Sequence, residues 1–282
     1  MVKIFSDSTC DLSQELLEKY DISILPLHIL LGEKEYCDGV DITPDEIFQW
    51  SDAQKTTPKT SAPALDMAME MLEPFVKEKQ PVICFSISED MSTSANVMRM
   101  AASELEAEDL VTVIDSASLS TGIGLLVLHA AEMAQAGKTV EEIQTEIEEL
   151  KSKVRASFVV DTLVYLYRGG RCNGLAAMFG SALHLHPMIV VENGKMHSSK
   201  KYRGKLSKVI LDYAKDLKEQ MEQARSERVF ITHSGCSPEV VEKVRSFLEE
   251  LHIFDEILIT RAGGVISSHC GPGTLGVLFI EK

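Results

Sequence analysis

Hydrophobic residues along the chain fall into short β-branched runs and longer amphipathic stretches, and the two kinds alternate from end to end. The short runs predict strands over residues 2–5, 24–31, 82–85, 111–114, 158–160, 188–191, 229–232, 257–260 and 277–280. The longer stretches predict helices over residues 13–20, 44–50, 63–78, 94–106, 121–135, 140–152, 206–224 and 238–251. Because this alternation is typical of βαβ units, we predict an α/β fold.

The predicted elements divide into two sets. Three strand–loop–helix units lie in the first half of the chain, and two more with a closing strand lie in the second. The charged helix that ends at Lys153 separates the sets, so we expect two α/β domains, residues 1–154 and residues 155–282. No linker rich in Pro, Gly or Ser joins them, and we therefore expect the domains to pack tightly.

Loops with hydroxyl groups follow several of the predicted strands, and one more, Thr60-Ser61, precedes a predicted helix. These loops are Ser6-Asp7-Ser8-Thr9, Thr60-Ser61, Ser86-Ile87-Ser88, Ser92-Thr93-Ser94, Asp115 to Gly122, and His233-Ser234. In a parallel α/β sheet, loops at the carboxyl ends of the strands share one edge, where ligands bind and helix N-termini point their amides. Each loop alone fits an ordinary helix cap. Together they favour a site for an oxyanion, without a full opposite charge.

The charge of the chain limits its partners. The net charge of −15 argues against a nucleic-acid-binding surface. One stretch, residues 193–211, departs from this by having no acidic residue. Its basic residues are Lys195, Lys200, Lys201, Arg203, Lys205 and Lys208. The stretch fits either a solvated loop and helix start or a docking patch for an acidic partner or a phosphate.

Targeting signals and membrane spans are not evident. The apolar run at the N-terminus is cut short by Ser6 and Asp7, unlike that of a signal peptide. The most apolar helix, residues 123–134, contains His129 and Glu132 and is too short to span a bilayer. The six cysteines include no Cys-x-x-Cys pair, which fits reduced thiols. We therefore expect a cytoplasmic protein with no transmembrane segment.

Enzyme motifs are mostly missing from the sequence. There is no G-x-S-x-G elbow and no P-loop, and Gly122-x-Gly124 lacks the third glycine of a dinucleotide fingerprint. His269 and Cys270 would point apart on an extended chain, which weakens a Cys–His nucleophile. We expect neither a metal nor a cofactor.

Several methionines stand beside the polar loops. These are Met67, Met71, Met91 and Met98. Ordinary core packing accounts for them, and flexible thioethers would also suit the wall of an adaptable apolar tunnel.

Motifs in order along the whole chain resemble the DegV family. They are Ser6-Asp7-Ser8-Thr9 at the start, Thr60-Ser61-Ala62-Pro63, Asp115-Ser116 with Gly122-x-Gly124, Tyr165-x-Tyr167-Arg168-Gly169-Gly170-Arg171, Tyr202-Arg203-Gly204, and His269-x-Gly271-Pro272-Gly273 near the end. Each motif alone is weak, but their order and spacing across nearly all 282 residues are specific.

That resemblance implies two α/β domains with a long-chain fatty acid between them, at the carboxyl ends of the N-terminal strands. It implies that Thr60, Ser92 and His269 bind the carboxylate, with Ser61 and Ser94 close by. The chain departs from the family pattern at Ala62, Thr93 and Ala95, where the family has glutamine, glycine and an aromatic residue.

The resemblance also implies a partner. Members of the family present the bound acid to a separate fatty acid kinase, and Arg171 and Arg203 match basic positions linked to that step. Such a carrier is a lipid-binding protein without catalytic residues of its own.

Two other functions stay open on the sequence alone. A small hydrolase or acyltransferase would use Ser92 or Ser94 with His269. A binding module for another anion, such as a phosphorylated metabolite, would use the same hydroxyl loops.

Overall fold

The first part of the chain is built on a parallel sheet. The computed structural model describes residues 1–171 and 185–282. The sheet has the order β2-β1-β6-β7. Its strands are β1 (Lys3–Asp7), β2 (Ile22–Leu25), β6 (Val82–Ser86) and β7 (Val111–Asp115). All residues of β1 and β6 are buried, as expected for central parallel strands covered on both faces.

Helices connect these strands. They are η1 (Ser8–Cys10), α1 (Gln14–Lys19), α2 (Pro44–Gln54), α3 (Leu65–Lys77), α4 (Ser94–Glu104), α5 (Thr121–Gln135) and α6 (Val140–Lys151). Capping boxes begin two of them: the hydroxyl of Thr43 caps α2 with Glu46, and that of Thr139 caps α6 with Glu142. These signals explain why the predicted starts of α2 and α6 are confirmed.

The second part is built on a six-stranded mixed sheet of order β10-β9-β8-β13-β11-β12. The strands are β8 (Val154–Val159), β9 (Leu185–Glu192), β10 (Lys195–Arg203), β11 (Arg228–Ser234), β12 (Glu256–Arg261) and β13 (Thr274–Ile280). Only β11 and β12 pair in parallel. Three helices accompany this sheet: α8 (Leu206–Asp216), α9 (Lys218–Met221) and α10 (Pro238–Leu251).

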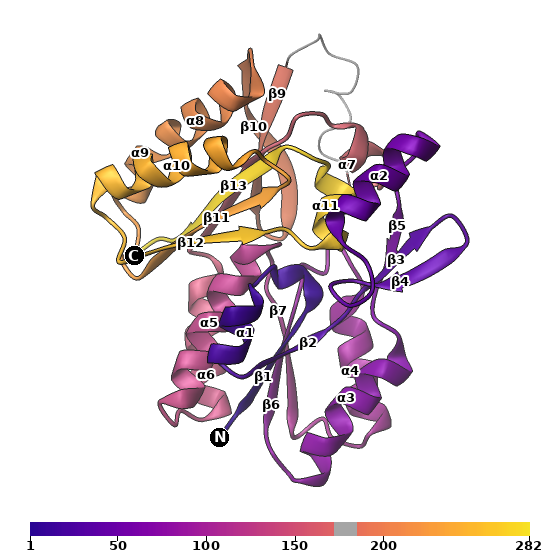
Figure 1. Cartoon of the computed structure of the whole chain (residues 1–282). Helices are drawn as coiled ribbons and strands as arrows, with labels where there is room; N and C mark the ends of the chain where they lie inside the picture. The colour runs from indigo at the N-terminus through magenta and orange to yellow at the C-terminus, as the bar shows by residue number, and fades with distance from the viewer. Residues whose placement is uncertain (172–184) are drawn as a thin grey trace.

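Helix α5 joins the two parts. It contacts β1 and β6 of the parallel sheet and β8 and β13 of the mixed sheet, and it lies between them in Figure 1. This position explains why it is the most apolar helix in the sequence. Phe85 of the first sheet and Phe158 and Leu278 of the second belong to one continuous core. The two parts are therefore packed tightly, and the α/β prediction is confirmed.

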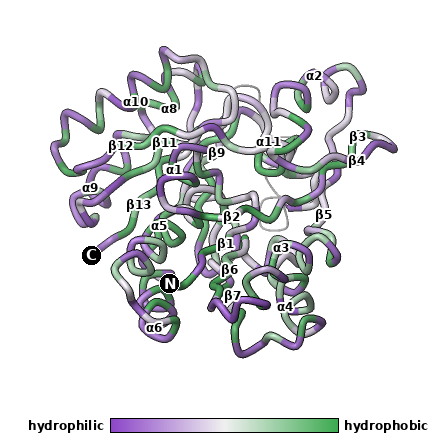
Figure 2. The backbone as a smooth tube through the Cα atoms, turned by 60° about the horizontal axis from the view of Figure 1, so that its bottom comes forward, coloured by the Kyte–Doolittle hydropathy of each residue, from purple (hydrophilic) through white to green (hydrophobic). Residues whose placement is uncertain are grey.

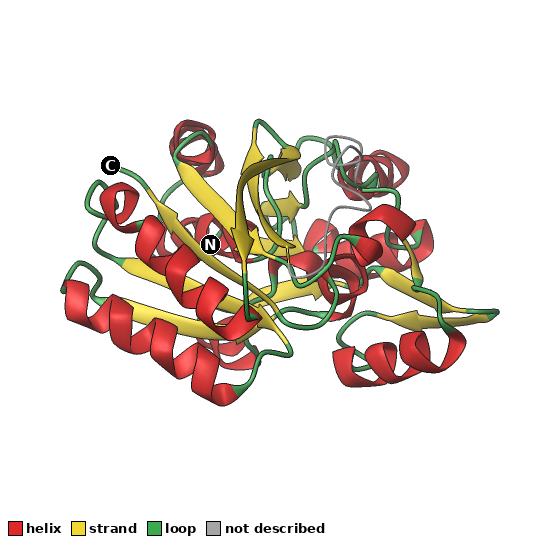
Figure 3. Cartoon of the chain, turned by 90° about the horizontal axis from the view of Figure 1, so that it is seen from above, coloured by secondary structure: helices red, strands yellow, loops and turns green. Residues whose placement is uncertain are grey.

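The predicted strand over residues 24–31 is wrong, because the chain changes sheets inside it. Pro26 has no N–H to donate to a ladder, so β2 ends at Leu25. The next strand, β3 (His28–Leu31), pairs in a separate three-stranded sheet with β4 (Lys34–Cys37) and β5 (Lys59–Ser61). This small sheet projects to one side (Figures 1 and 3). Strands β4 and β5 are short and polar and gave no hydrophobic pattern.

The basic stretch is a strand rather than a loop. β10 pairs antiparallel with β9 through the tight turn at Asn193 and Gly194, with an irregular register between Ser198 and Lys201. It forms one edge of the mixed sheet, where exposed lysines are common because they discourage pairing with another chain. The single helix predicted over residues 206–224 is two helices, α8 and α9.

Two short helices were also missed, α7 (Val164–Arg168) and α11 (Gly264–Cys270). His269 and Cys270 therefore lie on a helix, and the prediction of an extended chain there is wrong. Figure 2 shows α11 as a hydrophobic segment between the two parts of the molecule. No helix among the described residues is long and apolar enough to cross a membrane.

Candidate functional site

Two of the predicted site residues meet although 209 positions separate them. Thr60 lies on β5 and His269 near the end of α11. The Thr60 Oγ1 and His269 Nε2 atoms are 2.8 Å apart, which is a hydrogen bond. The small sheet and α11 therefore bring one side chain from each part of the molecule to one point.

The imidazole of His269 is enclosed by the end of α7. A Cβ built on Gly169 would come within 2.2 Å of His269 Nδ1, so only glycine lets α7 approach this closely. The Nδ1 atom is buried without a hydrogen-bond partner among the described residues. Burial, and then the nearby charge of Arg171, lowers the pKa of His269 to about 4. At neutral pH this ring is uncharged, so it can form hydrogen bonds but no ion pair.

Arg171 supplies the positive charge at this point. Its guanidinium donates to the Gly169 carbonyl at 2.8 Å and to the Met91 carbonyl at 3.3 Å, and it lines the same cavity as His269. Burial lowers the pKa of Arg171, but an arginine stays protonated under all ordinary conditions. From the sequence we expected hydroxyl groups without a full opposite charge, and this expectation is wrong, because the guanidinium of Arg171 lines the same cavity.

The serines of the two loops reach the same place. Ser92 and Ser61 line the cavity with Thr60. Ser94, the first residue of α4, is buried beside it, and its Oγ lies 3.0 Å from Ser92 Oγ. The backbone N–H of Ser94 also donates to Ser92 Oγ at 3.3 Å. Ser94 thus orients Ser92 rather than facing the cavity itself.

Arg203 lies outside this group. It is exposed at the end of β10 and is not among the residues that line the cavity. The structure therefore separates the two arginines that the sequence paired, with Arg171 inside and Arg203 on the surface.

The cavity that these residues line is mostly apolar, and we call it the proximal cavity. Its volume is about 40 Å³. Its apolar walls come from both parts of the chain and consist of Leu27, Ile87, Met91, Leu119, Leu166, Met196, Val265, Ile266 and Cys270. Of the four methionines noted in the sequence, Met91 is a wall residue, whereas Met67, Met71 and Met98 pack in the core beside the parallel sheet.

A second cavity, the distal cavity, lies next to the first. Its volume is about 20 Å³, and it lies between the residues just before α5, helix α11 and the mixed sheet, where Phe158 and Leu278 form part of its wall. Leu119, Ile266 and Cys270 line both cavities. The two cavities therefore adjoin across these three side chains, and we call them the two lobes, with the Thr60–His269 pair and Arg171 in the proximal lobe. Lobes of about 40 and 20 Å³ have room for one or two water molecules, so a long apolar chain enters only when the wall side chains move apart. The lining, with polar groups at one end and apolar walls, has the chemistry that binds an amphiphile with one anionic group.

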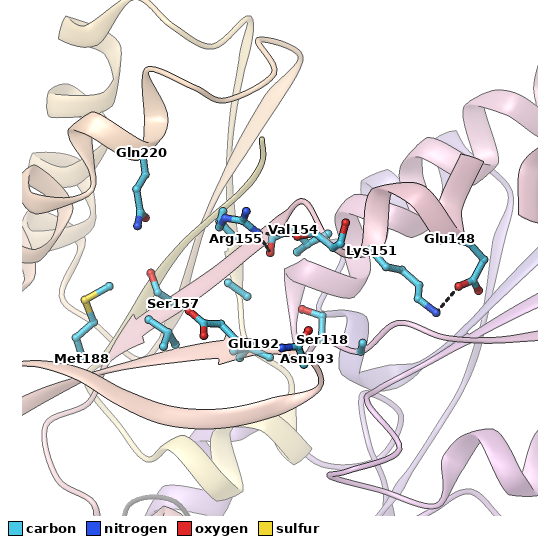
Figure 4. A pocket seen from close by; sticks show the side chains of 15 residues that line it. Ser118, Glu148, Lys151, Val154, Arg155, Ser157, Met188, Glu192, Asn193 and Gln220 are labelled. Carbon is cyan, nitrogen blue, oxygen red and sulfur yellow. Dashed lines mark hydrogen bonds and ion pairs between the residues drawn. The ribbon is translucent and has the colours of Figure 1, made fainter. Parts of the chain in front are cut away.

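A larger hollow lies elsewhere, and we call it the outer groove (Figure 4). Its volume is about 450 Å³, between α6, β8 and β9. Its lysine and arginine are already paired: Lys151 with Glu148 at 2.7 Å, and Arg155 with Glu281. None of the predicted site residues lines it.

Among the described residues, no three His, Cys, Asp or Glu side chains gather as a metal site.

The hydrophobic pattern of the sequence did not predict α7 and α11, the two short helices that enclose His269. The glycine pair before Arg171 was the available signal for a close approach.

Comparisons with known proteins identify the family of the chain. The model of the DegV family, described as an uncharacterised protein family, matches residues 1–282. A DegV domain-containing protein of Clostridium perfringens is 31% identical over 283 residues, covering 100% of this chain and 99% of that protein.

Solved structures give the same result. A DegV family protein from Thermus thermophilus, described as binding fatty acid, superposes with a TM-score of 0.91 at 30% identity and covers 100% of this chain and 99% of its own. A stearic acid-binding protein from Eubacterium ventriosum has a TM-score of 0.88 at 31% identity with the same coverage. With its motifs, fold and full-length match in agreement, this chain belongs to the DegV family.

Proposed function

We propose that this protein is a carrier that buries a long-chain fatty acid between two domains, residues 1–154 and 155–282, and presents the carboxylate to a partner fatty acid kinase. The observation that carries the proposal is the Thr60–His269 hydrogen bond, with Arg171 beside it, at an apolar space of two lobes. The fatty-acid-binding descriptions of the Thermus thermophilus and Eubacterium ventriosum proteins support it.

The apolar chain would provide most of the affinity. A sixteen-carbon acid has about fourteen methylenes, and at roughly 0.8 kcal/mol each their burial is worth on the order of 11 kcal/mol before the costs of binding. Hydrogen bonds to a charged group add about 1.5–3 kcal/mol each. The two lobes would therefore set the affinity, and the polar groups would set which end of the ligand faces outward.

The head group would lie among Thr60, Ser92, His269 and Arg171, with Ser61 at the edge. A neutral histidine and two hydroxyls can donate hydrogen bonds to the carboxylate oxygens, while Arg171 neutralises their charge. Reaching the kinase requires that the carboxylate stay accessible while the methyl end is buried in the distal cavity.

The basic strand β10 would bind the kinase. Lys201 and Arg203 are exposed and form no ion pair within the described parts of the chain, whereas Lys200 is bound to Asp216 at 2.5 Å. The end of β10 leads into Leu206, whose Cδ2 would lie 3.0 Å from a Cβ on Gly273, in the loop that follows His269. A basic edge on a chain of net charge −15, next to the end of α11, favours an acidic partner surface.

The geometry favours binding over catalysis. A hydrolase would need a basic histidine in contact with its serine. His269 Nε2 contacts Thr60 instead, and burial holds its pKa at about 4. The hydroxyl groups of Ser92 and Ser94 form a hydrogen bond with each other. A phosphorylated metabolite also fits poorly, because most of the wall of the proximal cavity is apolar.

The test is to identify the bound lipid. Protein purified from bacteria, extracted with organic solvent and analysed by mass spectrometry, is expected to yield about one long-chain fatty acid per chain. Hexadecanoic acid should displace a fluorescent fatty acid, and phosphorylated metabolites should not. Protein that yields no acyl ligand and takes up no added acid would exclude the carrier. Turnover of an ester by the isolated chain would favour the hydrolase instead.

A further inference from the structure

The helix that bears His269 begins without a capping side chain of its own. Helix α11 starts at Gly264 after Gly263, and neither residue has a side chain that could accept a hydrogen bond. The first amides of any helix need acceptors from outside it. Where these amides find acceptors therefore decides how the start of α11 is fixed.

The acceptors are two buried carboxylates from the first part of the chain. Gly263 N donates to Asp11 Oδ1 at 2.8 Å, and Gly264 N donates to Asp38 Oδ1 at 2.7 Å. The second oxygen of each carboxylate accepts a hydroxyl, from Ser120 for Asp11 and from Ser8 for Asp38. Asp11 is 5% exposed and Asp38 is 2% exposed. Burying an acidic group costs stability unless it is hydrogen-bonded. Each of these two carboxylates is compensated by one amide of α11 and one hydroxyl.

Glycine makes the approach possible. A Cβ on Gly264 would come within 2.6 Å of Ile29 Cδ1 and 2.9 Å of Asp38 Oδ1. Any larger residue there would push α11 away from the small sheet that carries Thr60. The close approach and the two carboxylates thus act on the same turn of the helix.

The other end of α11 returns to the first part through His269. His269 lies five positions after Gly264, or about 7.5 Å along the helix, and its imidazole then meets Thr60 at 2.8 Å. We propose that Asp11 and Asp38 are positioning residues for the head-group site: by fixing where α11 begins, they fix the imidazole of His269 against Thr60. This role rests on the proposed fatty-acid-binding function of that site.

We call the two hydrogen bonds from the start of α11 to Asp11 and Asp38 the clamp. The clamp does not require charged carboxylates. Burial raises the pKa of Asp11 to about 8 and raises that of Asp38. A protonated carboxyl still offers an acceptor oxygen to an amide. The two bonds to α11 are therefore kept whether or not each group carries a proton.

A matched pair of substitutions isolates the clamp. Asp38→Asn keeps an acceptor oxygen for Gly264 N, and Asp38→Leu keeps a similar volume but removes the acceptor. Asp38→Leu leaves the Gly264 N–H and the Ser8 hydroxyl without their acceptor, so some loss of stability is expected and the variant must be shown to fold. The control is Thr121→Val, which removes a buried hydrogen bond of 2.6 Å to Thr232 between the two parts and does not touch α11.

Two readouts are needed. The first is the NMR titration of the His269 imidazole in histidine-labelled protein, assigned with His269→Gln. The second is the affinity for hexadecanoic acid. In Asp38→Leu the titration of His269 is expected to move from about 4 toward the ordinary 6.5, because the ring is released from burial. The dissociation constant should rise roughly ten-fold, equivalent to about 1.4 kcal/mol. Asp38→Asn and Thr121→Val should match the wild type.

The outcomes are decisive in each case. An unchanged titration and affinity in Asp38→Leu would overturn the inference, as would an equal change in Thr121→Val. Should Asp38→Leu fail to fold, Ser8→Ala replaces it and should shift the titration in the same direction by less; no shift overturns the proposal. Wild-type protein that binds no fatty acid would refute the proposed function, whereas the titration still decides the role of the clamp.

Discussion

The proximal cavity and the outer groove differ in size and in chemistry. The groove is the larger hollow, about 450 Å³ against about 40 Å³, and lies on the outside between α6 and β8–β9. Its lysine and arginine are paired with glutamates. The proximal cavity is apolar, joins a second lobe, and contains a buried neutral histidine beside an arginine.

This difference shows that the chemistry of the lining, rather than volume, identifies the site. Charges that are already paired and exposed to water gain little from a ligand. An apolar wall with a few convergent polar groups gains both burial and orientation. The following experiments test whether the two hollows differ in function as they do in chemistry.

Blocking the junction of the two lobes should have the largest effect. Leu119→Phe places a ring where Leu119 lines both cavities. A long chain that loses contact for about six methylenes gives up roughly 5 kcal/mol. Calorimetry should show much weaker binding of hexadecanoic acid and a smaller effect on octanoic acid. Gln220→Phe in the outer groove is the control and should bind both as the wild type does. Equal binding of the long acid by Leu119→Phe would exclude the two-lobe channel.

Acid should destabilise the protein through His269. Its pKa is about 4 in the folded state against 6.5 when unfolded, so between these values the unfolded state binds more protons. The contribution of neutral His269 to the free energy of unfolding is fully present above pH 6.5. It is lost as the pH falls through about 4, and for a shift of this size it is worth about 3 kcal/mol.

The free energy of unfolding measured by urea at several pH values checks this. Wild type should lose stability relative to His269→Gln between about pH 6.5 and pH 4. If the free energy of unfolding depended on pH in the same way for the wild type and for His269→Gln, the imidazole would not be held neutral in the cavity.

Removing the charge in the proximal cavity should have a smaller effect. Arg171→Gln should weaken binding of a fatty acid by about 1.5–3 kcal/mol, the worth of a hydrogen bond to a charged group. Binding of the corresponding fatty alcohol should change little, since it has no carboxylate. Arg155→Gln in the outer groove is the matched control. A similar loss for acid and alcohol would show that Arg171 acts by packing alone.

Reversing charge on β10 should leave lipid binding unchanged. Lys201→Glu with Arg203→Glu changes exposed side chains outside the cavity lining. We expect normal fatty acid affinity with much slower acyl-phosphate formation by the kinase, and a weaker effect at high salt. Lys243→Glu on α10 is the control. An unaltered rate in the β10 variant would remove the docking role from this strand.

Much of the fold could be read from the sequence because its signals are local. Strands β1 and β6 are buried on both faces, and each contains a short hydrophobic run that marks it, Ile4-Phe5 in β1 and Val82 to Phe85 in β6. Capping boxes mark the starts of α2 and α6. Strand β10 was not predicted because an edge strand exposed to water has no hydrophobic alternation. Helix α11 was not predicted because its seven residues, which begin with a glycine and include two serines, have no clear helical period.

The sequence by itself determined the α/β class, the apolar α5, the family motifs and the residue types available for an acid group. Only the tertiary structure decided that Thr60 meets His269, that Arg171 lies inside the cavity and Arg203 outside it, and that Asp11 and Asp38 bind the start of α11. The physical reason is distance along the chain. Periodicity and caps report on neighbours within a few residues, whereas these contacts join residues between 80 and more than 200 positions apart, and they form only when both sheets and the short helices pack together.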